Sequence, residues 1–599
     1  MEIYESASLP AMFFAQARRL GDRPFLFRKR NSVWETMSWT ATARQIDLVA
    51  RGLKALGLAN GDRVLLVSEN RPEWLIADLA IMSAGGVTVP AYTTNTVADH
   101  LHLLNDSGAR MAIVSSRQLA ERIMVAAIQA DHPPQVIAID TEGLAQNPGV
   151  DLHTWNDLLT MGDAAPDIVH ERVDALKRGE LACLIYTSGT GGRPKGVMLS
   201  HGAIMCNCLG AFHLLLELGL SEERFLSFLP LSHSYEHTAG QFFPISLGAQ
   251  IWYAEGLEQL VSNMADCRPT MMTAVPRLYE VMRTRILASV ERSGGFKAKL
   301  FRRAVALGSK RYAKPGSLTI LEWLENQALN LLVRRKVANR FGGNLKALVS
   351  GGAPLNYDVG LFFTALGVRL VQGYGQTEAA PVISANRPLH IRLRTVGPPL
   401  KGVELRIAED GEILVRGEMV MLGYWKDPAM TAQVIKDGWL HTGDIGVLDE
   451  DGNIQITDRK KDLIVNSGGD NVSPQRVEGY LTLQPEIAQA MVYGDRRPHL
   501  VALVVPAPES AAAWAAAHGL PNDLAQLVAN PDFRRHIGDA VDRVNRELSA
   551  IERVRRFALT AEAFTVANEM STPTLKIRRH AIVGRFKREL EELYEERRA

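Results

Sequence analysis

The stretch that decides the fold is Tyr186-Thr-Ser-Gly-Thr-Gly-Gly-Arg-Pro-Lys-Gly-Val197, and it follows the apolar run Leu181-Ala-Cys-Leu-Ile185. The apolar run predicts a buried strand. The glycines permit close approach of a ligand, and successive N–H groups in such a loop can surround an anion. Hydroxyl donors and one positive charge are added by Thr187, Ser188, Thr190 and Lys195. The loop predicts phosphate binding, although a glycine-rich turn alone is also compatible with a plain turn. It is not a Walker A loop, because no Gly-Lys-Ser/Thr opens a helix at the required spacing.

The totals describe a chain of several domains. Its 599 residues can bury a large core, and 46% of them are hydrophobic. The net charge of +1 gives no indication of nucleic-acid binding. Four cysteines are too few for a disulfide framework, and no second Cys/His pair follows Cys206-Asn-Cys208, so we expect a reducing compartment and no structural zinc.

The chain has no obvious membrane-spanning segment in its sequence. The first residues, Met1-Glu-Ile-Tyr-Glu-Ser6, lack the basic and apolar regions of a secretory signal. The most apolar stretch, 74–92, is interrupted by Asp78 and by Gly85-Gly86. It falls short of the ~20 apolar residues of a membrane span. We therefore expect a buried helix, a turn and a strand at 87–90, in a protein that is soluble or peripheral.

Strands alternating with helices predict layered, mainly parallel sheets in the first 180 residues. The helix is expected at 41–58, and the strands at 63–68, 111–115 and 135–140. The tail has a different plan. Two further strands, a group of helices and a final charged helix are expected at 488–493, 500–505, 509–548 and 581–598.

Two later segments each run from a strand into a glycine turn. They are Leu345-Lys-Ala-Leu-Val-Ser-Gly-Gly-Ala-Pro354 and Val368-Arg-Leu-Val-Gln-Gly-Tyr-Gly-Gln-Thr-Glu378. Such turns lie at the carboxyl ends of strands, where α/β sheets bind ligands. Tyr374 can offer an aromatic face to adenine, Thr377 can bond a phosphate oxygen, and Glu378 suits Mg²⁺ shared with nucleotide phosphates. A strand-ending turn with a solvated glutamate is the alternative for either segment alone.

Polar groups continue after a predicted hairpin at 449–452. Asp444, in Asp437-Gly-Trp-Leu-His-Thr-Gly-Asp444, can accept hydrogen bonds from a ribose diol. The segment Ile454-Gln-Ile-Thr-Asp-Arg-Lys-Lys-Asp-Leu-Ile464 then leads into a glycine loop at 467–470.

In order and spacing, these motifs resemble those of the AMP-forming acyl-activating enzymes, the adenylate-forming superfamily that includes peptide synthetase adenylation domains and luciferases. The segment 270–280 resembles the long-chain acyl-CoA synthetases in particular. One departure is Gly191, where the family usually has a second threonine. The resemblance implies an α/β fold with a large N-terminal domain of layered α/β subdomains (1–457), a hinge linker (458–462) and a small mobile α+β C-terminal domain (463–599).

The resemblance also implies roles for individual residues. Catalytic roles fall on the mobile Lys576, on Lys195 and on His233, while the metal ligand is Glu378 and the hinge is Lys461. His237 is expected to be structural for a different reason, because a lone histidine is more often structural than catalytic. ATP or AMP is expected to be bound by Thr187, Ser188, Gly189, Thr190, Gly191, Lys195, Gly352, Ala353, Pro354, Gln372, Gly373, Tyr374, Gly375, Thr377, Asp444 and Arg459. CoA is expected to pass Ser467, Gly468 and Gly469.

The implied function is ATP-dependent activation of long-chain fatty acids to acyl-CoA by way of an acyl adenylate, with AMP and pyrophosphate as products. ATP, Mg²⁺ and CoA are the implied cofactors and co-substrates. The alternatives are a fatty acyl-AMP ligase that delivers acyl groups to a carrier protein, a non-catalytic lipid-binding relative and a luciferase-like oxygenase. Chain length, oligomeric state and the metabolic use of the product do not follow from the sequence.

The segment 292–340 is strongly basic, with acids only at Glu322 and Glu325. Its cations form either a solvated helical face or a patch for anionic lipid head groups or CoA phosphates. We expect a cytoplasmic protein, with peripheral contact through this region at the inner face of a membrane.

Overall fold

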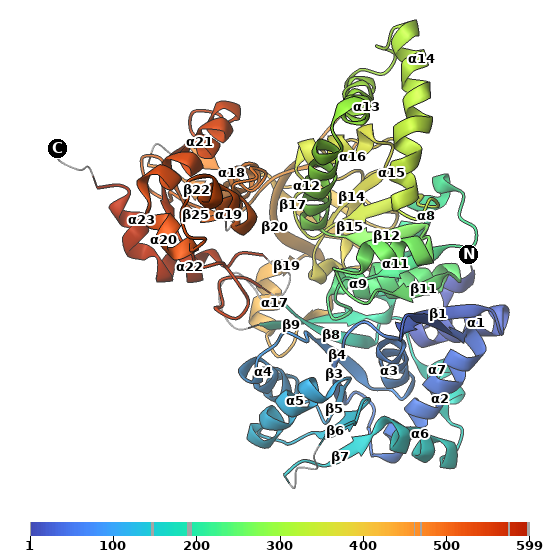
Figure 1. The fold of residues 1–599 in the computed structure, drawn as a ribbon. Helices are drawn as coiled ribbons and strands as arrows, with labels where there is room; N and C mark the ends of the chain where they lie inside the picture. Colours follow the sequence, from blue (N-terminus) through green and yellow to red (C-terminus); the bar gives the residue numbers. More distant parts are fainter. Residues whose placement is uncertain are drawn as a thin grey trace.

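The computed structural model describes residues 2–144, 149–187, 194–460, 462–467, 470–572 and 576–595. A large lobe contains the blue to light-orange part of the chain, and a small lobe of darker orange to red elements lies beside it (Figure 1). The predicted α/β class is confirmed, because parallel strands alternate with helices through the large lobe.

The first sheet contains the strands that lead into the predicted nucleotide-binding turns. It has eight strands in the order β15-β14-β13-β12-β10-β11-β1-β2. Its inner strands are parallel and its two edges are antiparallel. The strands are β1 (Pro24–Arg30), β2 (Val33–Ser38), β10 (Arg224–Ser227), β11 (Gln250–Tyr253), β12 (Met271–Ala274), β13 (Ala347–Ser350), β14 (Leu370–Gly375) and β15 (Val382–Ala385).

A second eight-stranded sheet has the order β18-β9-β8-β4-β3-β5-β6-β7. The predicted strands at 63–68, 111–115, 135–140 and 181–185 all belong to it. Its strands are β3 (Arg63–Val67), β4 (Val87–Ala91), β5 (Met111–Val114), β6 (Gln135–Ala138), β7 (Leu152–Thr154), β8 (Leu181–Thr187), β9 (Lys195–Ser200) and β18 (Gly423–Tyr424).

The apolar stretch at 74–92 has no amphipathic pattern because its first part lies in helix α3 (Pro72–Ser83), which is buried on all sides. Every residue of α3 except Glu73 is buried, so the helix needs no polar face. The chain then turns into β4, which confirms the expected helix, turn and strand. By length and composition, His201–Leu218 could also cross a membrane, but 56% of this stretch is buried inside the protein, as in a core helix.

The remaining helices of the large lobe cover the two sheets or lie at their edges (Figure 1). The predicted helix at 41–58 is α2, which begins after the N-cap Ser38. These helices are α1 (Leu9–Leu20), α2 (Trp39–Ala55), α4 (Val97–Ser107), α5 (Arg117–Gln129), α6 (Trp155–Ala164), α7 (Val169–Ala175), α8 (His201–Leu215), α9 (Ser234–Glu236), α10 (Phe243–Leu247), α11 (Leu260–Cys267), α16 (Tyr357–Ala365) and α17 (Pro428–Val434).

An antiparallel sheet closes the large lobe. Its order is β16-β17-β20-β19, with β21 paired to β20. The predicted hairpin at 449–452 connects β20 to β21. The strands are β16 (Glu404–Ile407), β17 (Glu412–Arg416), β19 (Ile435–Lys436), β20 (Trp439–Leu448) and β21 (Ile454–Arg459).

The small lobe packs helices on the sheet β24-β25-β26. The expected strands and helices are present, but the final charged helix was predicted wrongly as one element. It is broken at Phe586, which turns inward with Leu590 to pack in the core. The elements are β22 (Ile464–Val465), β23 (Asn471–Val472), α18 (Pro474–Leu481), β24 (Ile487–Tyr493), β25 (Leu500–Pro506), α19 (Pro508–Ala517), α20 (Leu524–Ala529), α21 (Pro531–Glu547), β26 (Val554–Leu559), α22 (Arg579–Arg585) and α23 (Lys587–Glu592).

A group of helices rises from the large lobe as a projection (Figure 1). It consists of α12 (Pro276–Ser293), α13 (Gly295–Ala313), α14 (Ile320–Leu329), the π-turn Asn330–Arg334 and α15 (Arg335–Arg340). This is the basic segment, and one of its cations is not a surface charge. Arg334 is buried and donates to the carbonyls of Ala304 and Ala365, so it supports the base of the projection.

Candidate active site

The turn after β13 and the strand β14 meet at one edge of the first sheet, because β12, β13 and β14 are parallel. Gly352 has a φ of +82°, which suits glycine, and it is exposed at this edge together with Ala353 and Pro354. Gln372 is buried, and its Oε1 atom has no hydrogen-bond partner among the described residues. A buried acceptor without a partner fits a site that binds a polar ligand.

Gly375 allows the backbone to pass this edge closely. A Cβ atom at this position would lie 1.8 Å from the carbonyl oxygen of Pro381. The neighbouring Tyr374 is buried, and its hydroxyl donates to Asp444 Oδ2 at 2.7 Å.

Asp444 and Arg459 face each other across β20 and β21. Their strand register pairs them directly, and Arg459 Nε lies 3.2 Å from Asp444 Oδ1. Burial raises the pKa of the Asp444 carboxyl, while Arg459, the Tyr374 hydroxyl and Lys576 act in the opposite direction. The carboxylate is thus held beside two donors, which fits the predicted contact with a ribose diol.

Lys576 reaches this group from the small lobe. The pKa of its amine is lowered, first by desolvation among the surrounding protein atoms and then by Arg459, while Asp444, Glu378 and Asp462 oppose the shift. The residue as a whole keeps an exposed surface, so part of the side chain contacts solvent while its amine is surrounded by protein atoms. The structure therefore brings the predicted mobile lysine to the predicted nucleotide residues.

Glu378 is held by a tyrosine that sequence reasoning missed. Tyr424 on β18 donates its hydroxyl to Glu378 Oε1 at 2.9 Å, and Lys195 Nζ lies 5.6 Å from the centre of the Tyr424 ring. Burial and the Glu378 charge raise the pKa of Tyr424, so the phenol remains a donor. The only available signal was the Gly423-Tyr424 pair, which carries no distinctive spacing.

His233 caps a short helix beside the same cluster. Its Nδ1 atom accepts from the Tyr235 N–H at 3.1 Å. Burial, and next the charge of Lys576, lowers the pKa of His233 to about 4, so the ring is neutral at pH 7. The next residue, Ser234, bonds the hydroxyl of Thr377 at 2.9 Å, so this hydroxyl already has a protein partner.

His237 lies deeper and pairs with Asp78. Its Nε2 atom is 2.9 Å from Asp78 Oδ2, and both side chains are fully buried. This location fits the structural role expected for His237.

Several predicted residues lie outside the described residues or away from this cluster. Outside are Ser188, Gly189, Thr190, Gly191, Lys461, Gly468 and Gly469. The flanks of the signature loop are described, and Thr187 pairs with Lys195 across β8 and β9. Ser467 lies in the small lobe, where its N–H donates to the carbonyl of Arg497. The structure thus brings Tyr374, Asp444, Arg459, Glu378 and Lys576 into one group, and it bonds Ser467 within the small lobe.

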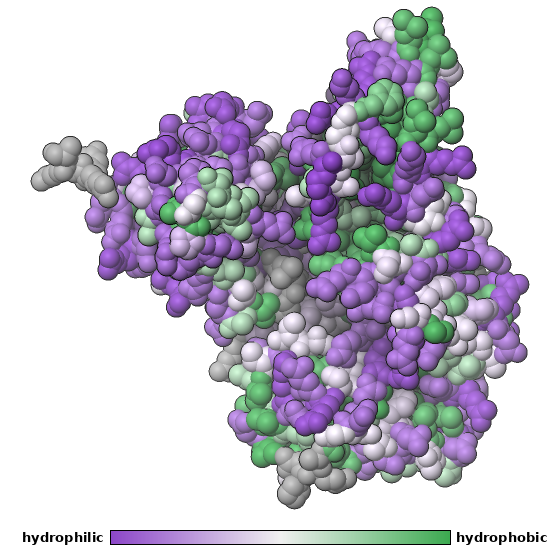
Figure 2. Space-filling view, in the orientation of Figure 1, coloured by the Kyte–Doolittle hydropathy of each residue, from purple (hydrophilic) through white to green (hydrophobic). Residues whose placement is uncertain are grey.

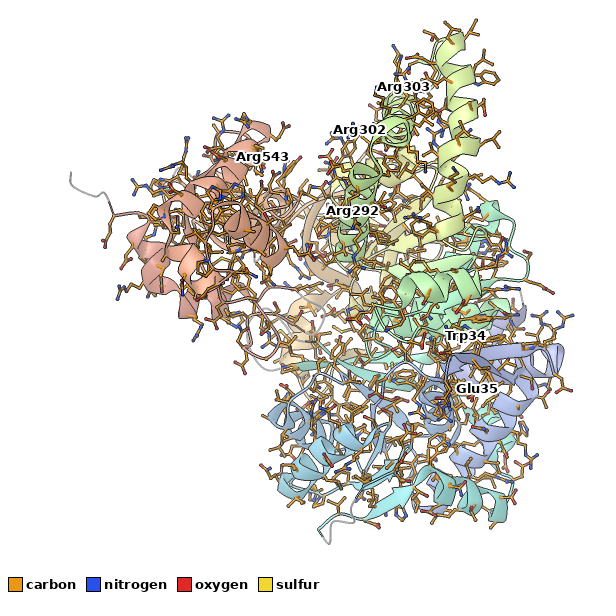
Figure 3. The ribbon with its side chains drawn as sticks, viewed as in Figure 1. Trp34, Glu35, Arg292, Arg302, Arg303 and Arg543 are labelled. Carbon is orange, nitrogen blue, oxygen red and sulfur yellow. The ribbon has the colours of Figure 1, made fainter. Side chains whose placement is uncertain are left out.

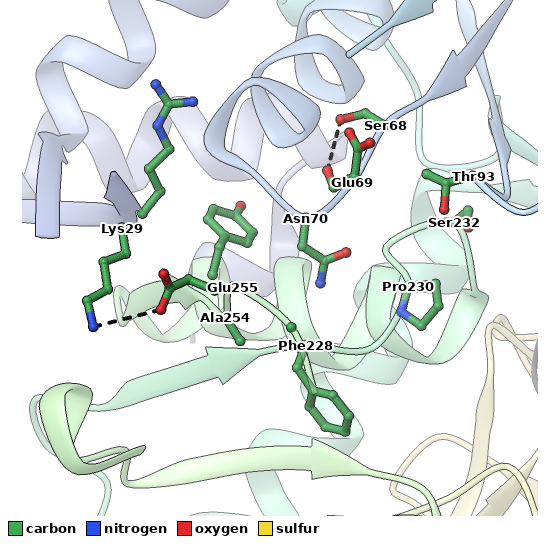
Figure 4. Close-up of a pocket in the computed structure, with 13 residues that line it drawn as sticks. Lys29, Ser68, Glu69, Asn70, Thr93, Phe228, Pro230, Ser232, Ala254 and Glu255 are labelled. Atoms are coloured by element: carbon green, nitrogen blue, oxygen red, sulfur yellow. Dashed lines mark hydrogen bonds and ion pairs between the residues drawn. The ribbon is translucent and has the colours of Figure 1, made fainter. Parts of the chain in front are cut away.

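A cavity of about 300 Å³ lies beside the segment that leads to His233 (Figure 4). Phe228, Pro230 and Ser232 line it, together with polar and charged residues that include Lys29 and Glu255. Lys29 and Glu255 pair at 3.7 Å. These mixed walls differ from a largely apolar tunnel, which would bury the methylene groups of a long acyl chain.

The family model described as AMP-binding enzyme matches residues 13–425, and the model described as AMP-binding enzyme C-terminal domain matches residues 461–598. The chain belongs to the AMP-binding enzymes. The second match begins inside the segment predicted as the hinge.

Full-length relatives of this AMP-binding enzyme have names that agree with one another. It is 33% identical over 98% of its length to the long-chain-fatty-acid–CoA ligase FadD15 of Mycobacterium bovis, with 97% of that protein covered. It is 31% identical to the peroxisomal long chain acyl-CoA synthetase 6 of Arabidopsis thaliana, covering 94% of this chain and 82% of the relative.

The adenylation domain of a carboxylate reductase from Mycobacterium chelonae shares the fold. The TM-score is 0.76 at 22% identity, with 98% of this chain and 91% of that chain covered. This likeness confirms the arrangement of a large N-terminal and a C-terminal part.

Proposed function

We propose that this AMP-binding enzyme converts a long-chain fatty acid, ATP and CoA into acyl-CoA, AMP and pyrophosphate through an acyl adenylate. The observation that carries the proposal is the position of Lys576 among Asp444, Arg459 and Glu378, in a chain related along its length to long-chain-fatty-acid–CoA ligases. Such a site neutralises charge as two anions are brought together.

In the first step, a fatty carboxylate oxygen attacks the α-phosphorus of ATP, and the bond to pyrophosphate breaks. Lys576 offsets the charge that the carboxylate and α-phosphate share. Asp444 and Arg459 hold the ribose, and Tyr374 packs against the adenine.

In the second step, the thiol sulfur of CoA attacks the acyl carbon, and the bond to AMP breaks. A free thiol has a pKa of about 8.5, so some thiolate is available without a dedicated base. We assign passage of CoA to the loop that begins at Ser467.

Glu378 and the nucleotide phosphates would hold Mg²⁺. Among the described residues, no group of three or more His, Cys, Asp or Glu side chains forms a metal site. A single carboxylate from Glu378 together with the nucleotide phosphates fits Mg²⁺, which is commonly bound by one or two carboxylates plus substrate phosphates. When bound, the ion would neutralise phosphate charge.

The fatty acid is proposed to come from a membrane that the basic projection contacts. Its support is a set of exposed cations that form no ion pair among the described residues: Arg292, Lys297, Lys299, Arg302, Arg311, Lys314, Arg335, Lys336 and Arg340. Two other cations of the segment are neutralised, since Arg303 pairs with Glu325 at 2.8 Å and Lys310 with Glu322 at 2.7 Å. A location at the inner face of a membrane remains part of this proposal.

The deciding experiment supplies ATP, Mg²⁺, CoA and fatty acids of increasing length, and follows AMP, pyrophosphate and thioester. We expect all three products with acids of roughly twelve or more carbons, because each buried methylene contributes about 0.8 kcal/mol. Formation of ADP and phosphate would refute the proposal. Transfer of the acyl group to a carrier protein but not to CoA would favour the acyl-AMP ligase.

A further inference from the structure

The outer face of α14 is apolar, although it faces solvent. We define the tip stripe as Ile320, Leu321, Trp323, Leu324, Leu331 and Leu332, whose exposed fractions run from 82% for Ile320 to 49% for Leu332. Ile320, Trp323, Leu324 and Leu331 follow the three-, four- and seven-residue spacings of one helical face, and the adjacent Leu321 and Leu332 widen it. Leu331 and Leu332 lie in the π-turn that follows α14. Figure 2 shows green side chains gathered at the far end of the projection, over α14.

The stripe is separate from the face that α14 uses for packing. Asn326 and Leu329 are buried on that inner face, and Val333 continues it into the π-turn. Glu322 and Glu325 bind Lys310 and Arg303 on α13. The acids of the segment are therefore tied to α13, and no acidic residue belongs to the tip stripe.

Cations flank the stripe along the rest of the projection. Figure 3 shows Arg292, Arg302 and Arg303 placed along α12 and α13, and of these only Arg303 is paired within the described part of the chain, with Glu325. Arg311 and Lys314 lie at the end of α13, and Arg335 and Lys336 begin α15. An apolar end surrounded by unpaired positive charge is complementary to a bilayer that presents anionic head groups over hydrocarbon.

A second copy of the chain fits this surface less well. Apposing two tip stripes would also bring the two sets of unpaired cations together, and like charges across an interface are unfavourable. Trp323 is also of the residue type that is enriched at membrane interfaces.

We propose that the tip stripe inserts into the surface of an anionic bilayer while the cations of α12, α13 and α15 bind the lipid head groups. This proposal rests on the proposed function, which takes the fatty acid from a membrane. It adds the element of the protein that inserts into that membrane. The projection is then a membrane anchor that leaves the nucleotide site on the body of the enzyme.

The test uses the full chain and vesicles of phosphatidylcholine alone or mixed with phosphatidylglycerol in equal parts. We expect Leu321→Ser/Leu324→Ser to weaken binding to the mixed vesicles at least tenfold. Val33→Ser removes an equally exposed apolar side chain, 64% exposed, from β2 and should leave binding unchanged. Unchanged vesicle binding by the double variant would overturn the proposal.

A second measurement reports insertion directly. The native cysteines Cys183, Cys206, Cys208 and Cys267 are all buried, so a polarity-sensitive dye can label Leu321→Cys selectively. We expect its emission to shift to the blue with mixed vesicles and not with phosphatidylcholine alone. No shift while the protein binds mixed vesicles would overturn insertion of the stripe. So would the same shift on self-association without lipid, which would assign the stripe to a second copy.

The outcome is independent of catalysis. Thioester formation from a detergent-dispersed fatty acid should be the same in the wild type and in Leu321→Ser/Leu324→Ser. Failure of the wild type to form a thioester would refute the proposed function and leave the vesicle result as it stands.

Discussion

At the scale of single residues, Lys576 carries the most specific prediction. Replacing it with alanine leaves the meeting carboxylate and α-phosphate without this positive charge, so adenylate formation should fall by about 10²–10³-fold. Thioester formation from a supplied acyl adenylate should fall far less. ATP–pyrophosphate exchange measures the first step, and Lys587→Ala, an exposed lysine of the same lobe, is the control. Equal losses in both steps would contradict the assigned role.

Tyr424 is predicted to position Glu378. Tyr424→Phe removes the hydroxyl that donates to Glu378 and keeps the ring beside Lys195. A hydrogen bond to a charged group of this kind corresponds to roughly a tenfold effect. We therefore expect a higher Mg²⁺ concentration for half-maximal adenylation. Tyr424→Leu, which also removes the ring, should be worse. An unchanged Mg²⁺ dependence in Tyr424→Phe would show that Glu378 needs no such support.

The buried carboxyl of Glu236 should make the stability of the protein depend on pH. It is fully buried, and burial raises its pKa to about 7, although Ser227 and Thr273 donate to it. The folded state holds the proton more tightly than the unfolded state, where the pKa is about 4.5. The free energy of unfolding therefore includes a favourable contribution from protonated Glu236, which is fully present below pH 4.5 and is lost as pH rises towards 7.

The measurement compares melting temperatures of the wild type and Glu236→Gln at pH 5 and at pH 7.5. The glutamine cannot ionise, so the variant should gain stability relative to the wild type at the higher pH, by roughly 3 kcal/mol at most. A constant difference between the two proteins at both pH values would contradict the raised pKa.

At the scale of elements, the close approach of β14 and β15 gives a matched pair of variants. Gly375→Ala places a Cβ atom 1.8 Å from the Pro381 carbonyl oxygen, so the strands must separate. The cost should be roughly 1–3 kcal/mol, with weaker ATP binding. At Gly373 the nearest atom would be 3.4 Å away, so Gly373→Ala should be much milder. Similar melting temperatures and ATP affinities in both variants would contradict a steric role of Gly375.

The elements that could be predicted from the sequence are those whose local residue pattern reveals whether they are buried or form a turn. The apolar runs at β3, β5 and β8 are buried on both sides, and the glycine turn after β13 follows its strand directly. The break at Phe586 could not be predicted, because a charged helical pattern continues through it and only tertiary packing turns the ring inward. The same applies to Tyr424, which meets Glu378 only through pairing of β18 with β9.

The tip stripe illustrates a different limit of sequence reasoning. Its apolar spacing is indistinguishable from that of a core-facing helix, and only the fold shows that this face of α14 has no partner among the described residues. Arg334 shows the opposite discrepancy. The sequence places it among the cations of a basic segment, but in the structure it is buried and donates to main-chain carbonyls.

At the scale of the whole molecule, the two lobes meet in an arrangement suited to one half of the reaction. Leu483 of the small lobe packs against a core cluster of the large lobe, and Lys576 lies near Asp444 and Glu378. Ser467, assigned to CoA, instead bonds Arg497 within the small lobe. If both residues serve the same site, they serve it in turn, and the small lobe must rotate between the two steps.

The expected pivot is Lys461, which lies outside the described residues. Lys461→Pro would fix φ near about −65° and restrict Lys460 as well. If these angles suit the adenylating arrangement, ATP–pyrophosphate exchange should persist while acyl-CoA production collapses. Lys460→Ala removes an exposed ion pair with Asp410 and a partly buried one with Glu412, and it should change neither assay appreciably. Once an unchanged melting transition shows that the variant is folded, parallel behaviour of the two assays in Lys461→Pro, both normal or both lost, would place the pivot elsewhere.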